Sequence, residues 1–347
     1  MRRGGLIRDV KKVVTVSVSD FGNSLVVTGG GLGDTLFHLP FIRSIQQQSS
    51  GQSIVLACKK GREIEQLFSD IDFVRSVLPI ARDQDVSGQP DLFRMRKLTR
   101  QANIDSAFIF HKSSGIAIAM MMAGVGQRFG YYFKGGTNRF FLNRGTCVPK
   151  SVPRPAFMNH AALVMDDAGL SYDYNDVRFH QPDHVVDAIC KELAVDRSRP
   201  IVALGVNASA DFKQWGGEKY TVISERLLKN YSCQVLLFGA GDVRDVADEI
   251  VTKSSFPERI IDLTDKKVPL NYSHALLQNC EAYIGNDSFG LNLAAMSSLP
   301  AIGIFAQGHH FSYCDWIKPV NSDSPDIHRI TPDRVWDEFE KLALSLT

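Results

Sequence analysis

The chain has 347 residues, which is too long for one ordinary hydrophobic core and predicts about two domains. Hydrophobic residues make up 44% and charged residues 22%, as is normal for a soluble globular protein. Because 39 basic residues stand against 38 acidic ones, no global charge favours nucleic acid or a membrane, and any such contact needs a local patch.

The apolar runs and the cysteines indicate the compartment. No apolar run approaches the ~20 residues of a membrane span. None of the cysteine pairs has the C-x-x-C spacing of zinc or redox sites, so we expect free thiols in a cytoplasmic protein. The six cysteines are Cys58, Cys147, Cys190, Cys233, Cys280 and Cys314.

The first elements surround a glycine loop. Strand-like runs at residues 13–19 and 25–28 lie on either side of a turn signal at 20–23, and they could pair as a hairpin at a sheet edge. The glycines are followed by apolar residues at helical spacing, Phe37, Phe41 and Ile45. Pro40 lies inside this pattern, so the helix either kinks there or restarts with Pro40 in its first turn.

Strands and helices then alternate, which favours parallel β/α layers over a sandwich. We expect strands at residues 53–58, 73–80, 104–110 and 127–133, and helices at 63–68 and 113–125.

Residues 134–155 lack periodicity and carry several cations. One interpretation is a solvated connection, and the other is a basic lip that holds an anionic acceptor. The cations are Lys134, Arg139, Arg144, Lys150 and Arg154.

The alternation restarts after a helix at residues 156–170, which we expect Gly169 to close. The polar stretch around 171–186 predicts the boundary between a first domain, 1–175, and a second, 176–347, whose last helix could pack back on the first. Binding sites in such doubly wound sheets cluster at the carboxyl ends of strands, so the cleft between the domains is the expected site. Second-domain strands are expected at 200–206, 233–241, 259–263, 281–287 and 300–306, and helices at 218–230, 244–253, 272–280 and 288–298.

Two familiar nucleotide loops are absent. The dinucleotide fingerprint G-x-G-x-x-G fails at Gly29, because Asp34 occupies its last position, and at Gly239, where Arg244 does. A Walker loop fails as well, since no G-K-[ST] follows the glycines. These absences disfavour oxidoreductases and nucleotide triphosphatases. In addition, the glycine loop is followed by the carboxylate of Asp34, where a bound phosphate would need hydrogen-bond donors.

Two segments of the second domain suit a diphosphate. Lys213 and Ser209 follow a buried strand, where a lysine can neutralise a phosphate and a serine can donate to one. Asn286 and Asp287 stand at a helix entrance whose free N–H groups, at Ser288 to Gly290, suit an anion. Alternatively, Lys213 is a solvated loop lysine and Asp287 a plain helix cap.

The order of these segments resembles the bacterial heptosyltransferases of glycosyltransferase family 9. "GLGDTLFHLPFIRSI" resembles the family's amino-terminal "GD.L...P" element, and "KQWGGEKY" resembles its "K.WP.E" segment. "HAALVMDDAGL", "LLFGAGDVRDVADEI", "DLTDKKVPL" and "IGNDSFGLNLAAMSSLPAIGIF" follow in the family's order, from about residue 24 to 306.

The resemblance implies a GT-B fold, with two Rossmann-like domains facing a central cleft. It also implies inverting, metal-independent transfer from an ADP-sugar, so no cofactor is expected. Carried over, Asp34 is the general base; the alternative, that Asp34 is a helix N-cap, is compatible with this role and stays open. Gly31 and Gly33 let acceptor and backbone approach, and Arg139 and Arg144 lie on the acceptor side.

On the donor side, the resemblance makes Lys213 and Ser209 stabilise the departing diphosphate in place of a metal. Asp287 would hold sugar hydroxyls, and Ser288 and Gly290 would add main-chain donors. The remaining donor-binding residues would be Gly239, Gly241, Asn286 and Asn292.

Three departures from the family pattern put the heptose identity of the donor in doubt. Phe289 replaces a glycine, Asn292 a histidine, and Gly216 a proline. The expected partners are a nucleotide-sugar donor and a saccharide or lipid-linked acceptor, commonly lipopolysaccharide core. Contact with the inner membrane through the basic region is a hypothesis. No nucleic-acid partner is expected. A non-catalytic nucleotide-sugar-binding relative is the main alternative, and a sugar-nucleotide epimerase or other Rossmann oxidoreductase is a weaker one. The paired His309 and His310 do not predict a metal site.

Overall fold

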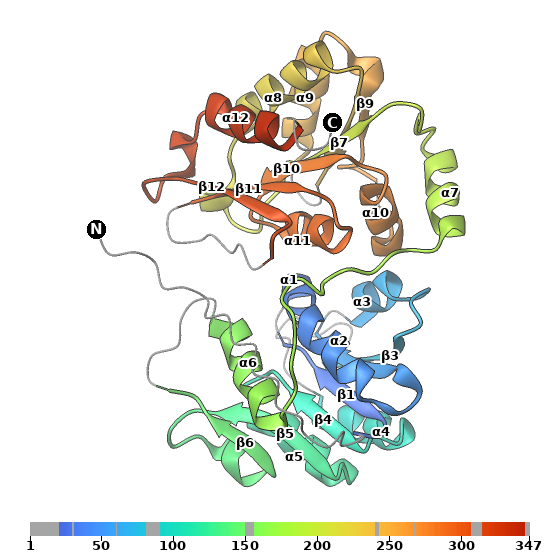
Figure 1. Ribbon diagram of the computed structural model, residues 1–347, viewed down its shortest axis with the longest axis vertical. Coiled ribbons are helices and arrows are strands. Elements are labelled where there is room, and N and C mark those ends of the chain that lie inside the picture. The colour runs from blue at the N-terminus through green and yellow to red at the C-terminus, as the bar shows by residue number, and fades with distance from the viewer. Residues whose placement is uncertain are drawn as a thin grey trace.

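The computed structural model describes residues 21–29, 31–59, 61–80, 91–149, 156–239, 243–266, 268–306 and 314–343. Two parallel six-stranded sheets lie one above the other, each covered by helices on both faces (Figure 1). The first has the order β3-β2-β1-β4-β5-β6 and the second β12-β11-β10-β7-β8-β9. The expected architecture of two doubly wound domains is confirmed.

The first domain follows the predicted alternation. The central strands of its sheet are apolar and buried on both faces, which is why helices must cover both sides. The strands are β1 (Ser24–Val27), β2 (Ile54–Cys58), β3 (Val74–Pro79), β4 (Ser106–Ile109), β5 (Gln127–Tyr132) and β6 (Arg144–Cys147). The α-helices are α1 (Leu32–Phe37), α2 (Leu39–Gln47), α3 (Gly61–Leu67), α4 (Leu92–Gln101), α5 (Ser114–Ala123) and α6 (Ala156–Ala168), and the short 3₁₀ helices are η1 (Ser50–Gln52) and η2 (Thr137–Phe140).

The second domain repeats this arrangement. Its strands are β7 (Ile201–Gly205), β8 (Gln234–Phe238), β9 (Ile260–Asp262), β10 (Ala282–Asn286), β11 (Ala301–Phe305) and β12 (Ile317–Asn321). Its α-helices are α7 (Asp183–Glu192), α8 (Gly217–Asn230), α9 (Arg244–Lys253), α10 (Leu270–Leu277), α11 (Phe289–Met296) and α12 (Pro332–Ala343), with 3₁₀ helices η3 (Asp211–Lys213), η4 (Pro257–Arg259) and η5 (Ile327–Arg329).

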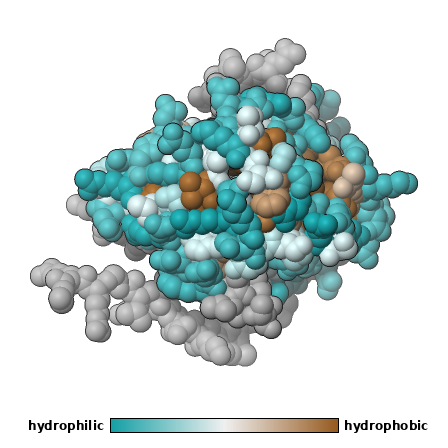
Figure 2. Space-filling model, turned by 90° about the horizontal axis from the view of Figure 1, so that it is seen from above, coloured by the Kyte–Doolittle hydropathy of each residue, from teal (hydrophilic) through white to brown (hydrophobic). Residues whose placement is uncertain are grey.

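Successive residues of a strand in the first domain pack alternately into two different hydrophobic cores. Val26 packs with residues of α2, α3 and α6, whereas Leu25 and Val27 pack with residues of α4 and α5. The side chains of a strand point alternately to its two faces, so each face of the sheet carries its own helical layer. Seen from the side of the second domain, the surface is mostly hydrophilic, with small separate hydrophobic patches (Figure 2).

The two domains contact each other through helices and through the linker. Helix α1 packs against α11, and α3 packs against α10. Gln181, in the linker before α7, donates from its side chain to the Leu67 carbonyl at 2.9 Å, and its main-chain N–H donates to Gln278 Oε1 at 2.7 Å. The linker is therefore bonded to both domains, and the expected boundary at residues 175 and 176 falls within it.

Two local predictions are resolved by the backbone. Helix α1 ends at Phe37, and α2 restarts at Leu39 with Pro40 in its first turn, so the restart and not the kink is correct. Gly169 has a φ of 73° directly after α6, a left-handed conformation that favours glycine and ends the helix as expected.

The sequence patterns missed α4, α7, β6 and β12. Strand β6 (Arg144–Cys147) lies inside the region interpreted as a loop; its side chains are largely exposed, so it shows no apolar pattern. The expected strand at 13–19 lies outside the described residues. Its expected hairpin with the run at 25–28 at a sheet edge is wrong, because β1 is a central strand that pairs with β2 on one side and β4 on the other.

The last helix packs on its own domain. Helix α12 contacts α8, β11 and β12, and its apolar face, Val335, Trp336 and Phe339, belongs to the core that Trp215 and Tyr220 also share. The expectation that this helix packs back on the first domain is therefore wrong for the part of α12 that is described.

Candidate active site

The carboxyl ends of both sheets face the junction between the domains. Helix α1 follows β1, helix α11 follows β10, and the two helices pack together at that junction (Figure 1). In open parallel sheets, ligands bind outside the carboxyl ends of the strands. The predicted catalytic and donor-binding residues lie mainly on these two helices and the loops beside them.

Asp34 lies in the first turn of α1, where it closes the helix entrance. Gly31, not Asp34, is the N-cap residue; Asp34 is the third residue of the helix, and its Oδ2 accepts a hydrogen bond from the Gly31 N–H at 2.8 Å, so it caps the helix from inside the first turn. Burial raises the pKa of the Asp34 carboxyl above that of an ordinary aspartate, while the Gly31 N–H and the charge of Lys59 lower it in part. A raised pKa makes the carboxylate a stronger base, so capping and base catalysis are compatible.

Lys59 and His111 are neighbours of this site that the motifs did not reveal. Each follows a strand adjacent to β1: Lys59 comes after β2, and His111 after β4. A Cβ on Gly29 would lie 2.2 Å from the His111 ring, so glycine is required for this close approach. Burial and the charges of Lys59 and Lys112 lower the pKa of His111, which favours its neutral form. The only sequence signal for Lys59 and His111 is that each follows a strand next to β1, and recognising this signal requires knowledge of the strand order.

Gly33 and Asn292 meet where α1 packs on α11. A Cβ on Gly33 would lie 4.0 Å from Asn292 Nδ2, and that amide donates to the Ser288 carbonyl at 2.9 Å. Asn292 is therefore buried between the domains, bonded within its own helix. Phe289 packs against the same core, and its predicted effect on donor fit stays a prediction.

Lys213 and Asp287 form an ion pair at the entrance of α11. Lys213 lies in η3, after β7, and its Nζ donates to Asp287 Oδ2 at 2.5 Å. Both side chains are largely buried. The structure thus brings together the two residues assigned to the diphosphate and to the donor sugar.

Asn286 holds the segment that carries Lys213. It is fully buried, its Oδ1 accepts from the Trp215 N–H at 3.2 Å, and its Nδ2 donates to the Val206 carbonyl and to Gln214 Oε1, both at 3.2 Å. All its amide groups are used inside the protein, so its geometry fits a positioning role better than the direct donor contact expected from the sequence.

Gly216, the residue after Trp215, explains one departure from the family pattern. It has a φ of 108°, a conformation that proline cannot adopt because its ring fixes φ near −65°. Glycine at this position therefore gives the entrance of α8 a path that the family's proline could not follow.

The start of α11 is left open. Ser288 is the N-cap residue but makes no capping hydrogen bond through its side chain. Its buried Oγ lies beside the fully buried Tyr283 hydroxyl, and this contact lowers in part the pKa of Tyr283, which burial raises. A Cβ on Gly290 would come within 2.7 Å of the Tyr283 hydroxyl, so Gly290 lets the tyrosine reach beneath the helix start.

The remaining donor-side predictions lie nearby. Ser209 is exposed in the loop after β7. Gly239 ends β8, and a Cβ there would lie 2.9 Å from Val243 Cγ2, so the backbone passes too close for a side chain. Gly241 lies outside the described residues.

Arg139 and Arg144 are not brought together. Arg139 is exposed in η2, whose Asn138 donates to the Lys112 carbonyl near the carboxyl end of β4. Arg144 begins the parallel edge strand β6, so it lies at the amino end of its strand, whereas Asp34 follows the carboxyl end of the central strand β1. Its expected acceptor-side role is disfavoured by this placement. Lys150 and Arg154 lie outside the described residues.

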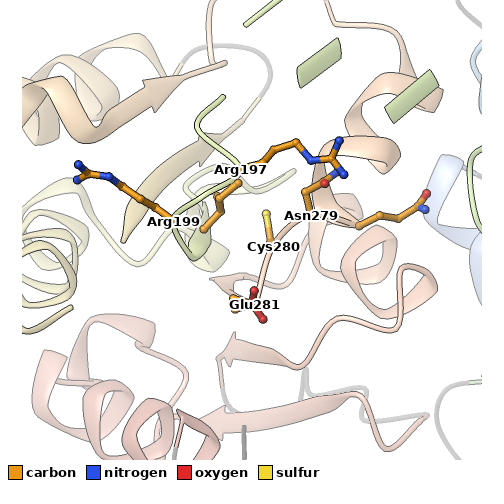
Figure 3. Close-up of a pocket in the computed structure, with 7 residues that line it drawn as sticks. Arg197, Arg199, Asn279, Cys280 and Glu281 are labelled. Atoms are coloured by element: carbon orange, nitrogen blue, oxygen red, sulfur yellow. The ribbon is translucent and has the colours of Figure 1, made fainter. Parts of the chain in front are cut away.

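A hollow of about 310 Å³ lies elsewhere on the second domain. Its lining comes from the segments that enter β7 and β10, at the amino edge of the sheet, and includes Arg197, Arg199 and Glu281 (Figure 3). None of the predicted site residues lines it. Within the described parts of the chain, no three His, Cys, Asp or Glu side chains are placed to hold a metal ion, and none of the helices there is long and apolar enough to cross a membrane.

Comparisons with known proteins show which family and fold this chain resembles. The chain is 26% identical to lipooligosaccharide heptosyltransferase 2 of Haemophilus influenzae over 227 residues, which span 61% of this chain and 63% of that relative. It is similar in structure to ADP-heptose lps heptosyltransferase II of E. coli, with a TM-score of 0.74, 19% identity, and coverage of 93% of this chain and 99% of the other. A second structure, E. coli heptosyltransferase WaaC with ADP-2-deoxy-2-fluoro heptose, gives a TM-score of 0.66 at 18% identity, covering 92% of this chain and 99% of that one.

These structural likenesses establish the fold. The sequence profile of glycosyltransferase family 9 (heptosyltransferase) matches residues 93–321, which is more than half of the chain. The chain therefore belongs to glycosyltransferase family 9, the heptosyltransferase family.

Proposed function

We propose that this protein is an inverting glycosyltransferase that moves a sugar, heptose by family, from an ADP-sugar to a hydroxyl of a saccharide acceptor. The observation that carries the proposal is the packing of α1, with its basic carboxylate, against α11, with its open start and adjacent lysine. These are the two groups that a displacement at the sugar's anomeric carbon requires.

In the proposed reaction, Asp34 accepts the proton of the acceptor hydroxyl as its oxygen bonds to the anomeric carbon. The bond from that carbon to the diphosphate oxygen breaks, and ADP leaves with the electron pair. Lys213 exchanges its contact with Asp287 for the diphosphate, and the N–H groups at the start of α11 add to the stabilisation. Asp287 is then available to bind sugar hydroxyls. We expect no metal to be needed.

The donor and acceptor classes come from the relatives. WaaC was determined with an ADP-heptose analogue, and the curated relative is named for lipooligosaccharide. We therefore propose ADP-heptose as the donor and a lipopolysaccharide-core or similar saccharide as the acceptor, reached from the cytoplasmic side of the inner membrane.

A non-catalytic nucleotide-sugar-binding relative is the second candidate. The observation that favours it is Asn292, which replaces the family's histidine and is bonded to the Ser288 carbonyl. Asparagine can donate a hydrogen bond but cannot carry a charge.

The test combines binding with turnover. A thermal-shift panel of ADP, UDP, GDP, NAD and ADP-sugars should give a selective response to ADP and ADP-sugars, and a coupled assay should detect ADP release that depends on an acceptor saccharide. Selective binding without any ADP release would favour the binding protein, and a response to NAD alone would favour an oxidoreductase.

A further inference from the structure

Helix α4 presents a stripe that mixes one aromatic residue with cations. Phe93, Arg96, Lys97 and Arg100 follow the i, i+3, i+4, i+7 spacing of one helix face, opposite the buried Met95 and Thr99. The Phe93 side chain is 81% exposed, although a phenylalanine of this size is normally buried. The stripe therefore faces away from the core.

Helix α5 lies beside α4 and adds apolar surface. It has no charged residue, and its last turn exposes Met121 and Met122, which are 41% and 45% accessible. The guanidinium groups of α4 border these methionines, because Arg96 Nε donates to the Met122 carbonyl at 3.2 Å and Arg100 Nε to the Ala123 carbonyl at 3.4 Å. Cations and apolar side chains are thus interleaved on one surface, which we call the α4–α5 face.

The α4–α5 face carries positive charge that is not paired within the described parts of the chain. Neither helix contains a carboxylate, and Arg96, Lys97 and Arg100 form no ion pair with any residue that the structure describes. Because the chain as a whole has a formal charge of only +1, this charge is a property of the face and not of the protein.

The face continues toward the active-site edge of the sheet. The first turn of α5 is joined to η2 by a 2.7 Å hydrogen bond between the Ser114 and Thr137 hydroxyls. There Phe140 is 67% exposed, and the Arg139 guanidinium lies 4.5 Å from its ring centroid. The same pairing of a cation with an exposed aromatic ring recurs at this end.

We propose that the α4–α5 face docks on an anionic lipid bilayer. Exposed Phe and Met side chains can enter the headgroup boundary, while Arg and Lys bind the anionic headgroups from the same side. Nucleic acid would match the cations but not the apolar side chains between them, so the combination favours a lipid surface.

The test is co-sedimentation with vesicles of phosphatidylcholine alone or with 30% phosphatidylglycerol. The wild-type protein should bind the anionic vesicles more tightly and be released by salt. Arg96→Gln/Lys97→Gln/Arg100→Gln should weaken that binding about 100-fold, since each cation near an anionic surface contributes roughly a fivefold factor. Phe93→Ser, which removes no charge, should weaken it about tenfold.

The matched control removes three exposed lysines from other helices, Lys229→Gln/Lys253→Gln/Lys341→Gln. It should reduce binding less than threefold, although it changes the net charge equally. Equal binding to both vesicle types, equal losses in the two triple variants, or selective binding of duplex DNA in place of vesicles would overturn the proposal. Neither donor nor acceptor is present, so the result is independent of the proposed transfer reaction.

Discussion

The two domains use the same strand–turn–helix unit in opposite ways at their junction. In the first domain, the entrance of α1 is closed by its own carboxylate, because Asp34 accepts the Gly31 N–H. In the second, the entrance of α11 has no side-chain cap, and the Ser288 hydroxyl lies beside that of Tyr283 beneath the helix.

This difference separates two chemical tasks. A helix start that holds its own anion cannot also attract a phosphate, whereas an open start with a nearby lysine can. The carboxylate after the first glycine loop, which excludes a phosphate cradle, thus becomes the base directed at an acceptor, and the diphosphate is left to the other domain. The predictions below test this division of roles.

The largest expected effect is the loss of the base. Asp34→Asn preserves an acceptor for the Gly31 N–H but cannot take a proton, so kcat should fall about 10²- to 10⁴-fold. Donor affinity, measured by calorimetry with an ADP-sugar, should stay within threefold. Asp91→Asn, which alters the N-cap of α4, is the matched control and should keep full activity. Unchanged turnover in Asp34→Asn would show that Asp34 is not the base and that the two helix entrances do not divide the chemistry in this way.

The pH dependence of the wild type sharpens the same point. Asp34 must be deprotonated to act, so kcat/KM should fall as the pH drops through its pKa, which burial raises above that of an ordinary aspartate. This acid limb should disappear from the residual activity of Asp34→Asn, as a stopped assay over a pH series would show.

Removing the lysine at the open entrance should be next in size. Lys213→Ala should lower kcat about 10²- to 10³-fold, because one donor to the departing diphosphate is lost. Lys229→Ala, which removes an exposed lysine paired with Glu225, should change kcat less than twofold. If both variants behave alike in a steady-state assay, Lys213 is only a structural ion-pair partner.

Acid stability tests a buried histidine of the second domain. His274 is fully buried on α10, and its Nδ1 lies 3.3 Å from Gln181 Nε2. Burial and the charge of His180 lower its pKa to about 3, while a hydrogen bond to the Met296 carbonyl raises it in part. As the pH falls below 6.5, the unfolded chain takes up a proton that the folded one refuses, so stability is lost down to about pH 3. At pH 5 the loss should be about 2 kcal/mol.

Urea unfolding between pH 7 and 5 measures this loss. His274→Gln should flatten the dependence, and His184→Gln, an exposed histidine of α7, controls for the loss of an imidazole. An equally steep dependence in His274→Gln would assign the acid sensitivity to other groups.

The smallest expected effect concerns the hydroxyl beneath α11. Tyr283→Phe removes a buried hydroxyl whose hydrogen-bonding neighbour is Ser288 Oγ, so the free energy of unfolding should fall by about 1 kcal/mol. Denaturant titration against the wild type measures it. A rise would mean that the Tyr283 hydroxyl makes no stabilising hydrogen bond with Ser288.

The sequence predicted the core strands and the two helix entrances because their apolar runs and glycines are local signals. It missed α4 because alternating cations hide its short buried stripe of Met95 and Thr99, and it missed β6 because that strand is largely exposed. Lys59 and His111 could not be found without the strand order, which places their strands on either side of β1.

Asn286 shows a different limit. A polar residue at the carboxyl end of a strand predicts ligand contact, but its amide is used up by Val206, Gln214 and Trp215. Only the folded neighbours decide whether such a residue faces the ligand or holds the segment that does.

The linker bonds of Gln181 constrain how the domains can move. Its side chain is bonded to the end of α3 and its main chain to α10, so these two helices are fastened at one point. Sliding one domain along the other would break both bonds at once, whereas a rotation about this point would keep them. A substrate would then enter between α1 and α11 by a hinge rotation of one domain relative to the other, with the hinge at Gln181.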